Sequence, residues 1–186
     1  AIDLLEAGNS GVVLVVGRSD WGPVDTFEDV TSEGEAERIY GTGLSITKLI
    51  KQALRGGAAT VKGHRIAGSS AAKATATLND GVAAAALDVT ALYEGARANN
   101  FRITVADHAI SGQTLELKEN GVLLESFYAA NGYNNEFEAV INEQSEYLTA
   151  VVNGADDRAL ANVTDSPMAA GDSGSTVIAG DYTAAQ

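Results

Sequence analysis

One apolar run near the start of the chain constrains the fold most. Gly11–Gly17 reads GVVLVVG, so four valines and a leucine stand between two glycines. Continuous runs of this kind are typical of strands that are buried on both faces, in the middle of a parallel or mixed sheet. The sequence therefore predicts an interior strand here, with a helix to follow.

Two helices are predicted after this strand. Ser32 and Glu35 have the spacing of a capping box, and Gly41 stands where a left-handed C-terminal cap belongs. A second helix is expected to begin at Ser45, because apolar residues recur after it with helical spacing. That stripe consists of Ile46, Leu49, Ile50, Ala53 and Leu54.

The chain then returns as a strand. Ala59–Ile66 reads ATVKGHRI and follows the helix-ending pair Gly56–Gly57. Strand, two helices and strand make a crossover unit, most simply with parallel strands and a right-handed connection. The segment Gly17–Ser32 is expected to be a corner of the scaffold, in which Pro23 turns the chain and Trp21 covers the end of the first strand.

The second region reads as mostly β with one helix. An Ala-rich stretch follows the crossover unit, and the alternation of residues 72–78 within it fits either a strand or a linker. Further on, Asn120–Gly121 predicts a tight hairpin turn with both residues at positive φ. Asn134–Gln144 predicts a helix and Glu146–Gly154 a further strand. The fold class expected is thus α/β to α+β, a strand-helix-helix-strand crossover unit followed by a mostly β domain.

Charge and composition exclude several classes of function. The 186 residues include 25 acidic and 12 basic side chains, for a formal charge of -13, and no cysteine. This balance argues against a nucleic-acid partner, because phosphate binding needs clustered Lys and Arg. No apolar stretch approaches the roughly 20 residues of a membrane span, so no membrane insertion is expected. Asp20, Asp25 and Asp29 lack the regular spacing and glycine of a calcium loop, and no metal or cofactor is expected.

One short motif suggests an enzyme. Gly171–Ser175 reads GDSGS, which contains the nucleophile turn of trypsin-like proteases, and His108 or His64 would have to serve as the base. Too few residues follow Ser173 to wall a specificity pocket, and Gly, Asp and Ser are ordinary turn formers. A serine hydrolase is kept as a remote alternative, and no catalytic residue is assigned.

Four segments in order resemble one family. They hold the opening strand with the corner Trp21, Gly22 and Pro23, the second helix with its Gly-Gly end, a Tyr-Gly-Asn turn before a strand, and an Asp-Tyr helix start. Together they resemble the N-terminal half of contractile tail sheath proteins of myophages, R-type bacteriocins and related injection systems. Ala98 departs from that family, which more often has glycine there. The four segments are Gly11–Gly41, Leu49–Ile66, Leu92–Val105 and Val177–Ala185, the last with Asp181–Tyr182.

The resemblance implies a domain organisation. Residues 1–10 would be an N-terminal linker arm, residues 11–68 the α/β part of a core domain, and residues 69–165 a β-rich inserted or outer domain. Residues 166–186 would return into a C-terminal core domain of the family that this chain lacks, so a fragment is expected. Within the arm, Ile2, Leu4 and Leu5 are expected to dock on a neighbouring subunit.

The resemblance also implies a mechanical function without catalysis. Such subunits form hexameric rings, stacked helically around an inner tail tube, and the sheath contracts to drive the tube through a target cell envelope. The implied partners are neighbouring sheath subunits, the inner tube protein, and the baseplate and tail terminator proteins. The implied location is a virion tail or tail-like particle, assembled in the host cytoplasm. A different structural module of a virion or surface, such as a decoration or adhesin domain, is the main alternative.

Overall fold

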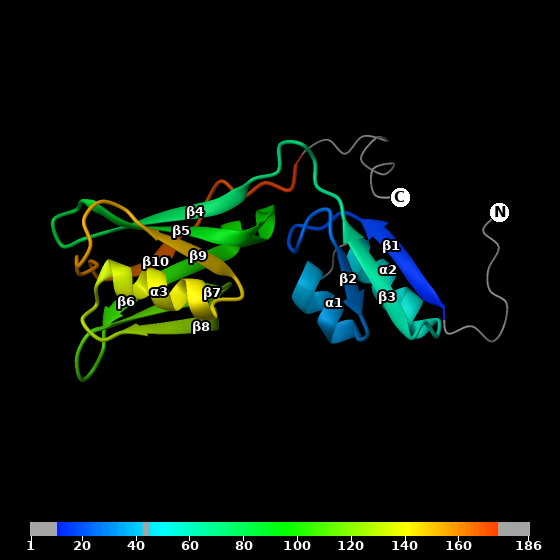
Figure 1. The fold of residues 1–186 in the computed structure, drawn as a ribbon, viewed down its shortest axis with the longest axis horizontal. Coiled ribbons are helices and arrows are strands. Elements are labelled where there is room, and N and C mark those ends of the chain that lie inside the picture. Colours follow the sequence, from blue (N-terminus) through cyan, green and yellow to red (C-terminus); the bar gives the residue numbers. More distant parts are fainter. Residues whose placement is uncertain (1–10, 43–44, 175–186) are drawn as a thin grey trace. The chain divides into compact units, whose positions relative to one another are not determined.

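The chain forms two compact units, each described here by itself (Figure 1). A computed structural model describes residues 11–42 and 45–174. Unit 1 comprises Ala1–Ala71 and Ser173–Gln186, and unit 2 comprises Ala72–Asp172. The predicted boundaries, 68/69 and 165/166, lie near these limits without coinciding with them.

Unit 1 contains a three-stranded sheet with the order β1-β3-β2. Its strands are β1 (Val12–Gly17), β2 (Phe27–Val30) and β3 (Thr60–Arg65), and β1 runs parallel to β3 as the crossover prediction requires. The strand β2 was not predicted. It lies in the segment expected to be only a corner, and it pairs antiparallel with β3.

The two predicted helices, α1 (Glu33–Tyr40) and α2 (Ser45–Arg55), are present. Ser32 caps α1, since its hydroxyl accepts the N–H of Glu35 at 3.2 Å. Gly41 has φ of 83° but ψ of 169°, so it ends α1 outside the left-handed helical conformation that was predicted. Both helices cover one face of the sheet. The core between them consists of Val15, Val30, Ala36, Tyr40, Ile46, Ile50 and Val61.

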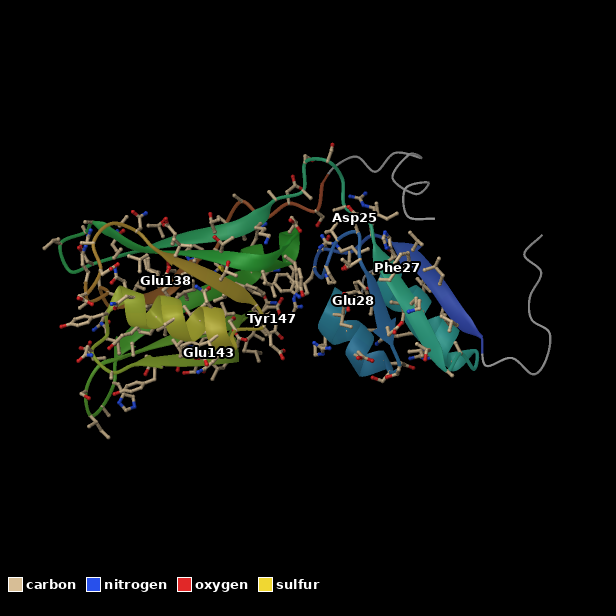
Figure 2. All side chains as sticks on the ribbon, viewed as in Figure 1. Asp25, Phe27, Glu28, Glu138, Glu143 and Tyr147 are labelled. Atoms are coloured by element: carbon tan, nitrogen blue, oxygen red, sulfur yellow. The ribbon has the colours of Figure 1, made fainter. Side chains whose placement is uncertain are left out.

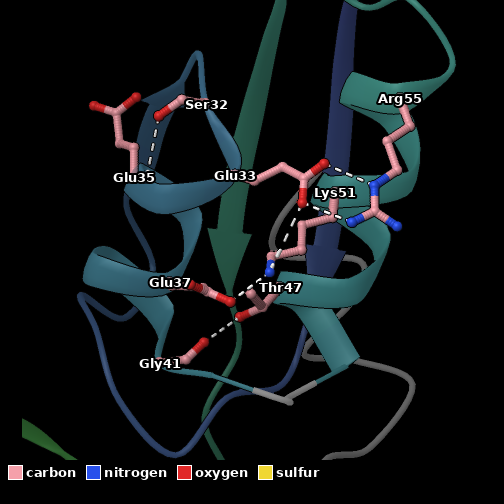
Figure 3. A network of polar contacts seen from close by, with 8 residues as sticks. All are labelled: Ser32, Glu33, Glu35, Glu37, Gly41, Thr47, Lys51 and Arg55. Atoms are coloured by element: carbon pink, nitrogen blue, oxygen red, sulfur yellow. Dashed lines mark hydrogen bonds and ion pairs between the residues drawn. The ribbon is translucent and has the colours of Figure 1, made fainter.

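Ion pairs join the outer sides of α1 and α2 (Figure 3). The Glu33 carboxylate accepts from Arg55 Nε and Nη2, both at 2.7 Å. Lys51 pairs with Glu37 and approaches Glu33 at 3.9 Å. The Arg55 guanidinium holds the pKa of the Glu33 carboxyl below its usual value. Because these side chains are open to solvent, the pairs fix the relative register of the helices more than they stabilise the fold.

β1 differs from its prediction in one important respect. Val13 and Val15 pack against the helices, but Val12 is 59% exposed and Leu14 is 49% exposed. Among the described residues, β1 also pairs with β3 alone, so it is an edge strand. The predicted burial on both faces is therefore wrong for β1 as the structure has it.

Unit 2 is mostly β, as predicted. One sheet has the order β10-β6-β7-β8 and another the order β4-β5-β9, and the helix α3 packs against β9 and β8 (Figure 1). The strands are β4 (Lys73–Asn79), β5 (Ala85–Glu94), β6 (Phe101–Asp107), β7 (Gln113–Glu119), β8 (Val122–Ala129), β9 (Leu148–Val152) and β10 (Val163–Pro167), with a short 3-10 helix at Ala96–Asn100 and α3 at Asn134–Gln144.

Local signals were read correctly in unit 2. Residues 72–78 overlap β4, so the strand reading holds and the linker reading is wrong. Asn120 and Gly121 have φ of 51° and 81°, which confirms the tight turn between β7 and β8. Phe137 and Ile141 of α3 are fully buried. None of the helices among the described residues is both long and apolar enough to cross a membrane.

The chain enters and leaves unit 2 at one place. Ala72 and Asp172 form an antiparallel bridge, with N–H to carbonyl distances of 2.8 and 2.9 Å in the two directions. Thr75 pairs in the same way with Ala169. Unit 2 is thus built as an insertion whose two ends are hydrogen-bonded together.

Asp80 stabilises the hairpin between β4 and β5, and this contact makes a prediction about pH. Arg158 donates to its carboxylate at 2.7 Å, and the N–H groups of Ala84 and Val82 add further bonds. Arg158 and these N–H groups hold the pKa of Asp80 below its ordinary value. A lowered folded-state pKa stabilises the fold above the unfolded-state pKa, and this stability is lost as the pH falls through the folded-state pKa.

Asp80→Asn is therefore expected to destabilise unit 2 at pH 7 and to cost progressively less on acidification. Denaturant unfolding of both proteins between pH 7 and pH 2 measures the gap. Asp156→Asn, at an exposed position of the same unit, controls for the removal of one negative charge. A gap that stays constant over this range would contradict the ion pair with Arg158.

Candidate functional site

The corner that follows β1 is the most tightly built part of unit 1. Trp21 is only 1% exposed, and Gly22 has φ of 100°. A Cβ placed on Gly22 would lie 2.4 Å from the carbonyl oxygen of Ile39, in the last turn of α1. The corner thus touches α1 backbone to backbone, and both the conformation and the space at this position require glycine.

Arg65, at the end of β3, holds this corner from the inside. Its side chain is fully buried, and its Nε donates to the carbonyl of Ser19 at 3.1 Å. Its Nη1 donates to the carbonyl of Gly22, and its own carbonyl accepts the N–H of Asp25 at 3.0 Å. One buried guanidinium therefore binds two carbonyls of a loop more than forty residues away in sequence.

Side-chain hydroxyls complete the polar contacts where α1 ends and α2 begins. Ser19 donates to the carbonyl of Tyr40, and Thr47 donates to the carbonyl of Gly41 at 2.7 Å. Ser45 donates to the carbonyl of Arg18 at 2.9 Å, so its hydroxyl joins α2 to the corner. Carbonyls at the end of a helix have no partner within the helix, and here loop and helix side chains supply two of them.

Tyr40 fills the space beneath the sheet and leaves its own hydroxyl unpaired. The hydroxyl is buried and has no hydrogen-bond partner among the described residues. A Cβ at Gly63 of β3 would lie 2.5 Å from it, so the ring packs directly on the β3 backbone. Burial raises the pKa of the Tyr40 phenol.

We expect Tyr40→Phe to keep the free energy of unfolding unchanged or to raise it by up to about 1 kcal/mol, because it removes a buried group without a partner. Tyr128→Phe is the matched control. Its hydroxyl donates to the carbonyl of Ser111 at 3.1 Å on the surface of unit 2, so its removal is expected to lower stability by about 0.5 kcal/mol. Denaturant melts measure both, and a clear loss of stability in Tyr40→Phe would reveal a partner for the hydroxyl.

The GDSG turn is attached to the corner. Ser173 donates its hydroxyl to the carboxylate of Asp20 at 2.8 Å and accepts the N–H of Gly68 at its carbonyl. His64 instead packs against the ring of Phe27, with 4.5 Å between the ring centres. His108 belongs to unit 2 and packs against Tyr128. The serine hydroxyl thus serves a turn, bonded to a carboxylate.

The other residues singled out from the sequence are dispersed. Asp25 lies 3.9 Å from His64, and Asp29 pairs with Lys62 at 2.6 Å. Within residues 11–42 and 45–174, no group of three or more His, Asp or Glu side chains is arranged to hold a metal ion. The predicted arm residues Ile2, Leu4 and Leu5, and the Asp181–Tyr182 pair, lie outside the described residues.

Sequence reasoning missed Arg65 as the centre of the corner. The signal was a basic residue at the end of an otherwise apolar strand, and its partners are backbone carbonyls, which carry no sequence signature. Ser19 was missed for the same reason, because its hydroxyl bonds the backbone of Tyr40 and receives the N–H of Trp21 at 3.2 Å.

Comparison with known proteins gives a fold and no sequence family. No protein-family profile matches the chain, and no curated protein matches it in sequence. Among solved structures, a sheath tail protein from Listeria innocua aligns with a TM-score of 0.76 and 23% identity over 97% of this chain and 38% of that one. A sheath tail protein from Desulfitobacterium hafniense aligns with a TM-score of 0.68 and 18% identity, over 99% of this chain and 41% of that one. The chain therefore has the fold of an N-terminal part of sheath tail proteins and spans about two fifths of their length.

Proposed function

We propose that this chain is part of a subunit of a contractile tail sheath. The observation that carries the proposal is the backbone likeness to two sheath tail proteins, which extends through both units and over nearly the whole chain. Likeness of fold is an argument by analogy, since one fold can serve unrelated functions. The conserved order of the crossover unit, the inserted β unit and the return of the chain makes the analogy specific.

The construction of the two units suits a mechanical function. A contracting sheath requires subunits that move as rigid bodies and keep their internal structure while contacts between them change. In unit 1 the corner is fixed to α1, α2 and β3 by buried hydrogen bonds to the backbone. In unit 2 the entering and leaving strands are bonded to each other. Both features resist internal deformation under load.

The proposed partners follow from the proposed function. Neighbouring copies would form hexameric rings stacked helically around an inner tube protein, with baseplate and terminator proteins at the two ends. The particle would be a phage tail or a related injection device, and contraction would release energy stored in a metastable extended state without a nucleotide.

Negative-stain electron microscopy of the protein encoded by the complete reading frame tests this proposal. Striated tubes that occur in a long, narrow form and a short, wide form are expected. Tubes of one fixed length and diameter, before and after treatment with acid or urea, would contradict contraction. A protein that stays monomeric at high concentration would contradict a sheath altogether.

A further inference from the structure

The face of the unit 1 sheet opposite the helices is open and partly apolar. The pairing register places the side chains of this face in rows that cross the sheet from β1 through β3 to β2. Phe27, labelled in Figure 2, is 51% exposed at the β2 end of one row. The rows are Val16, His64 and Phe27, then Leu14, Lys62 and Asp29, and finally Val12 and Thr60.

The apolar part of this open face lies on β1. Val12 and Leu14 are 59% and 49% exposed, whereas the β3 and β2 side chains in Leu14's row are the ion pair Lys62 and Asp29. Polar groups thus solvate the far side of the face, and the β1 side presents valine and leucine to water. Exposed patches of this kind mark surfaces that another element covers.

The outer edge of β1 is unprotected as well. Within the described residues β1 pairs with β3 alone, which leaves every second backbone N–H and C=O along its length directed away from the sheet. Natural edge strands are usually blunted by lysine, proline or a bulge. Val12–Gly17 contains no charge and no proline, and its register with β3 is continuous, so no such protection exists.

The sequence of β1 is that of an interior strand, although the structure places it at an edge. We propose that β1 is an interior strand of the complete protein. A further strand pairs with its free edge, and an apolar layer covers Val12 and Leu14. The pattern of an apolar run, which predicts burial on both faces, and the two uncovered surfaces are then explained together.

The occupant is polypeptide of the same longer protein, outside these 186 residues. The two solved chains with this fold are about two and a half times as long as this one, so each supplies polypeptide beyond the matched part. A second copy of this chain is disfavoured, because each copy has a formal charge of -13 and β1 has no complementary charge to offset the repulsion. The inference rests on the proposed function only in taking the chain as part of such a longer protein.

Hydrogen exchange of the β1 amides in dispersed monomers tests the inference separately from tube formation. Two proteins are compared at low micromolar concentration, the 186-residue chain and the product of the complete reading frame. The amides of Val12–Gly17 are expected to exchange on the order of 100-fold more slowly in the longer protein. Protection without tubes in the microscope would contradict the proposed function and support this inference, and tubes without protection would do the reverse.

Two leucines of unit 1 provide a matched pair of variants. Leu14 on the open face and Leu49 on α2 are 49% and 47% exposed, so replacement by lysine is tolerated at both in the 186-residue chain. In the longer protein, Leu14→Lys is expected to return β1 exchange to the rate of the short chain, and Leu49→Lys to leave it slow. Equal effects of the two variants would overturn the inference.

Three other results would also overturn it. A reading frame that ends at residue 186 leaves no polypeptide to act as the cover. Slow exchange of β1 in the short chain at low concentration would place the cover within these residues. Slow exchange that appears only as the concentration of the short chain rises would identify a second copy as the occupant.

Discussion

Gly22→Ala is expected to lower the free energy of unfolding of unit 1 by about 3–5 kcal/mol, the largest effect of any single methyl group in this chain. Two costs add. The residue has φ of 100°, which an L-side chain rarely adopts, and the new Cβ would meet the carbonyl oxygen of Ile39 at 2.4 Å. The contact is with backbone at the end of α1, so no side chain can rotate away, and the corner or the helix has to move.

Gly57→Ala is the matched control for conformation. Gly57 has φ of 99°, nearly the same as Gly22, but a Cβ there would meet nothing within 4 Å. Its cost is expected to be about 1 kcal/mol, from backbone conformation alone. Chemical denaturation of both variants isolates the steric part as the difference between them. Equal costs would show that the corner does not touch α1 as described.

Features set by neighbouring residues could be predicted from the sequence. Ser32 and Glu35 define a helix start through a bond between residues three apart, and the structure contains it. Asn120 and Gly121 define a hairpin through their own φ angles. The parallel pairing of β1 with β3 followed from the crossover rule, which depends on chain length and handedness more than on particular side chains.

Features set by distant contacts could not be predicted. Phe27–Val30 is too short, and too mixed in polarity, to read as a strand, and it becomes one only because β3 offers a free edge. Leu49 fits the apolar stripe of α2 but is 47% exposed, since nothing among the described residues covers it. The pattern of β1 was an informative failure, because it describes a strand with more neighbours than the 186-residue chain provides.

The second large effect is expected at the centre of the corner. Arg65→Met is expected to lower the free energy of unfolding by about 2–4 kcal/mol, because it leaves the carbonyls of Ser19 and Gly22 buried without their donor. Methionine fills much of the same volume, so the loss reports the hydrogen bonds more than a cavity. Arg65→Lys is expected to recover only part of it, since one ammonium group cannot reproduce the planar fork that reaches both carbonyls.

Arg55→Met is the control for removing an arginine that also makes two hydrogen bonds. Its bonds to Glu33 are as short, at 2.7 Å, but its side chain is 68% exposed. Water replaces those bonds when they are lost, so Arg55→Met is expected to cost far less than Arg65→Met. Denaturant melts of the three variants give the comparison. If Arg55→Met and Arg65→Met cost the same, the buried guanidinium does not hold the corner together; a large cost at Arg65 alone, only partly relieved by lysine, would show that it does.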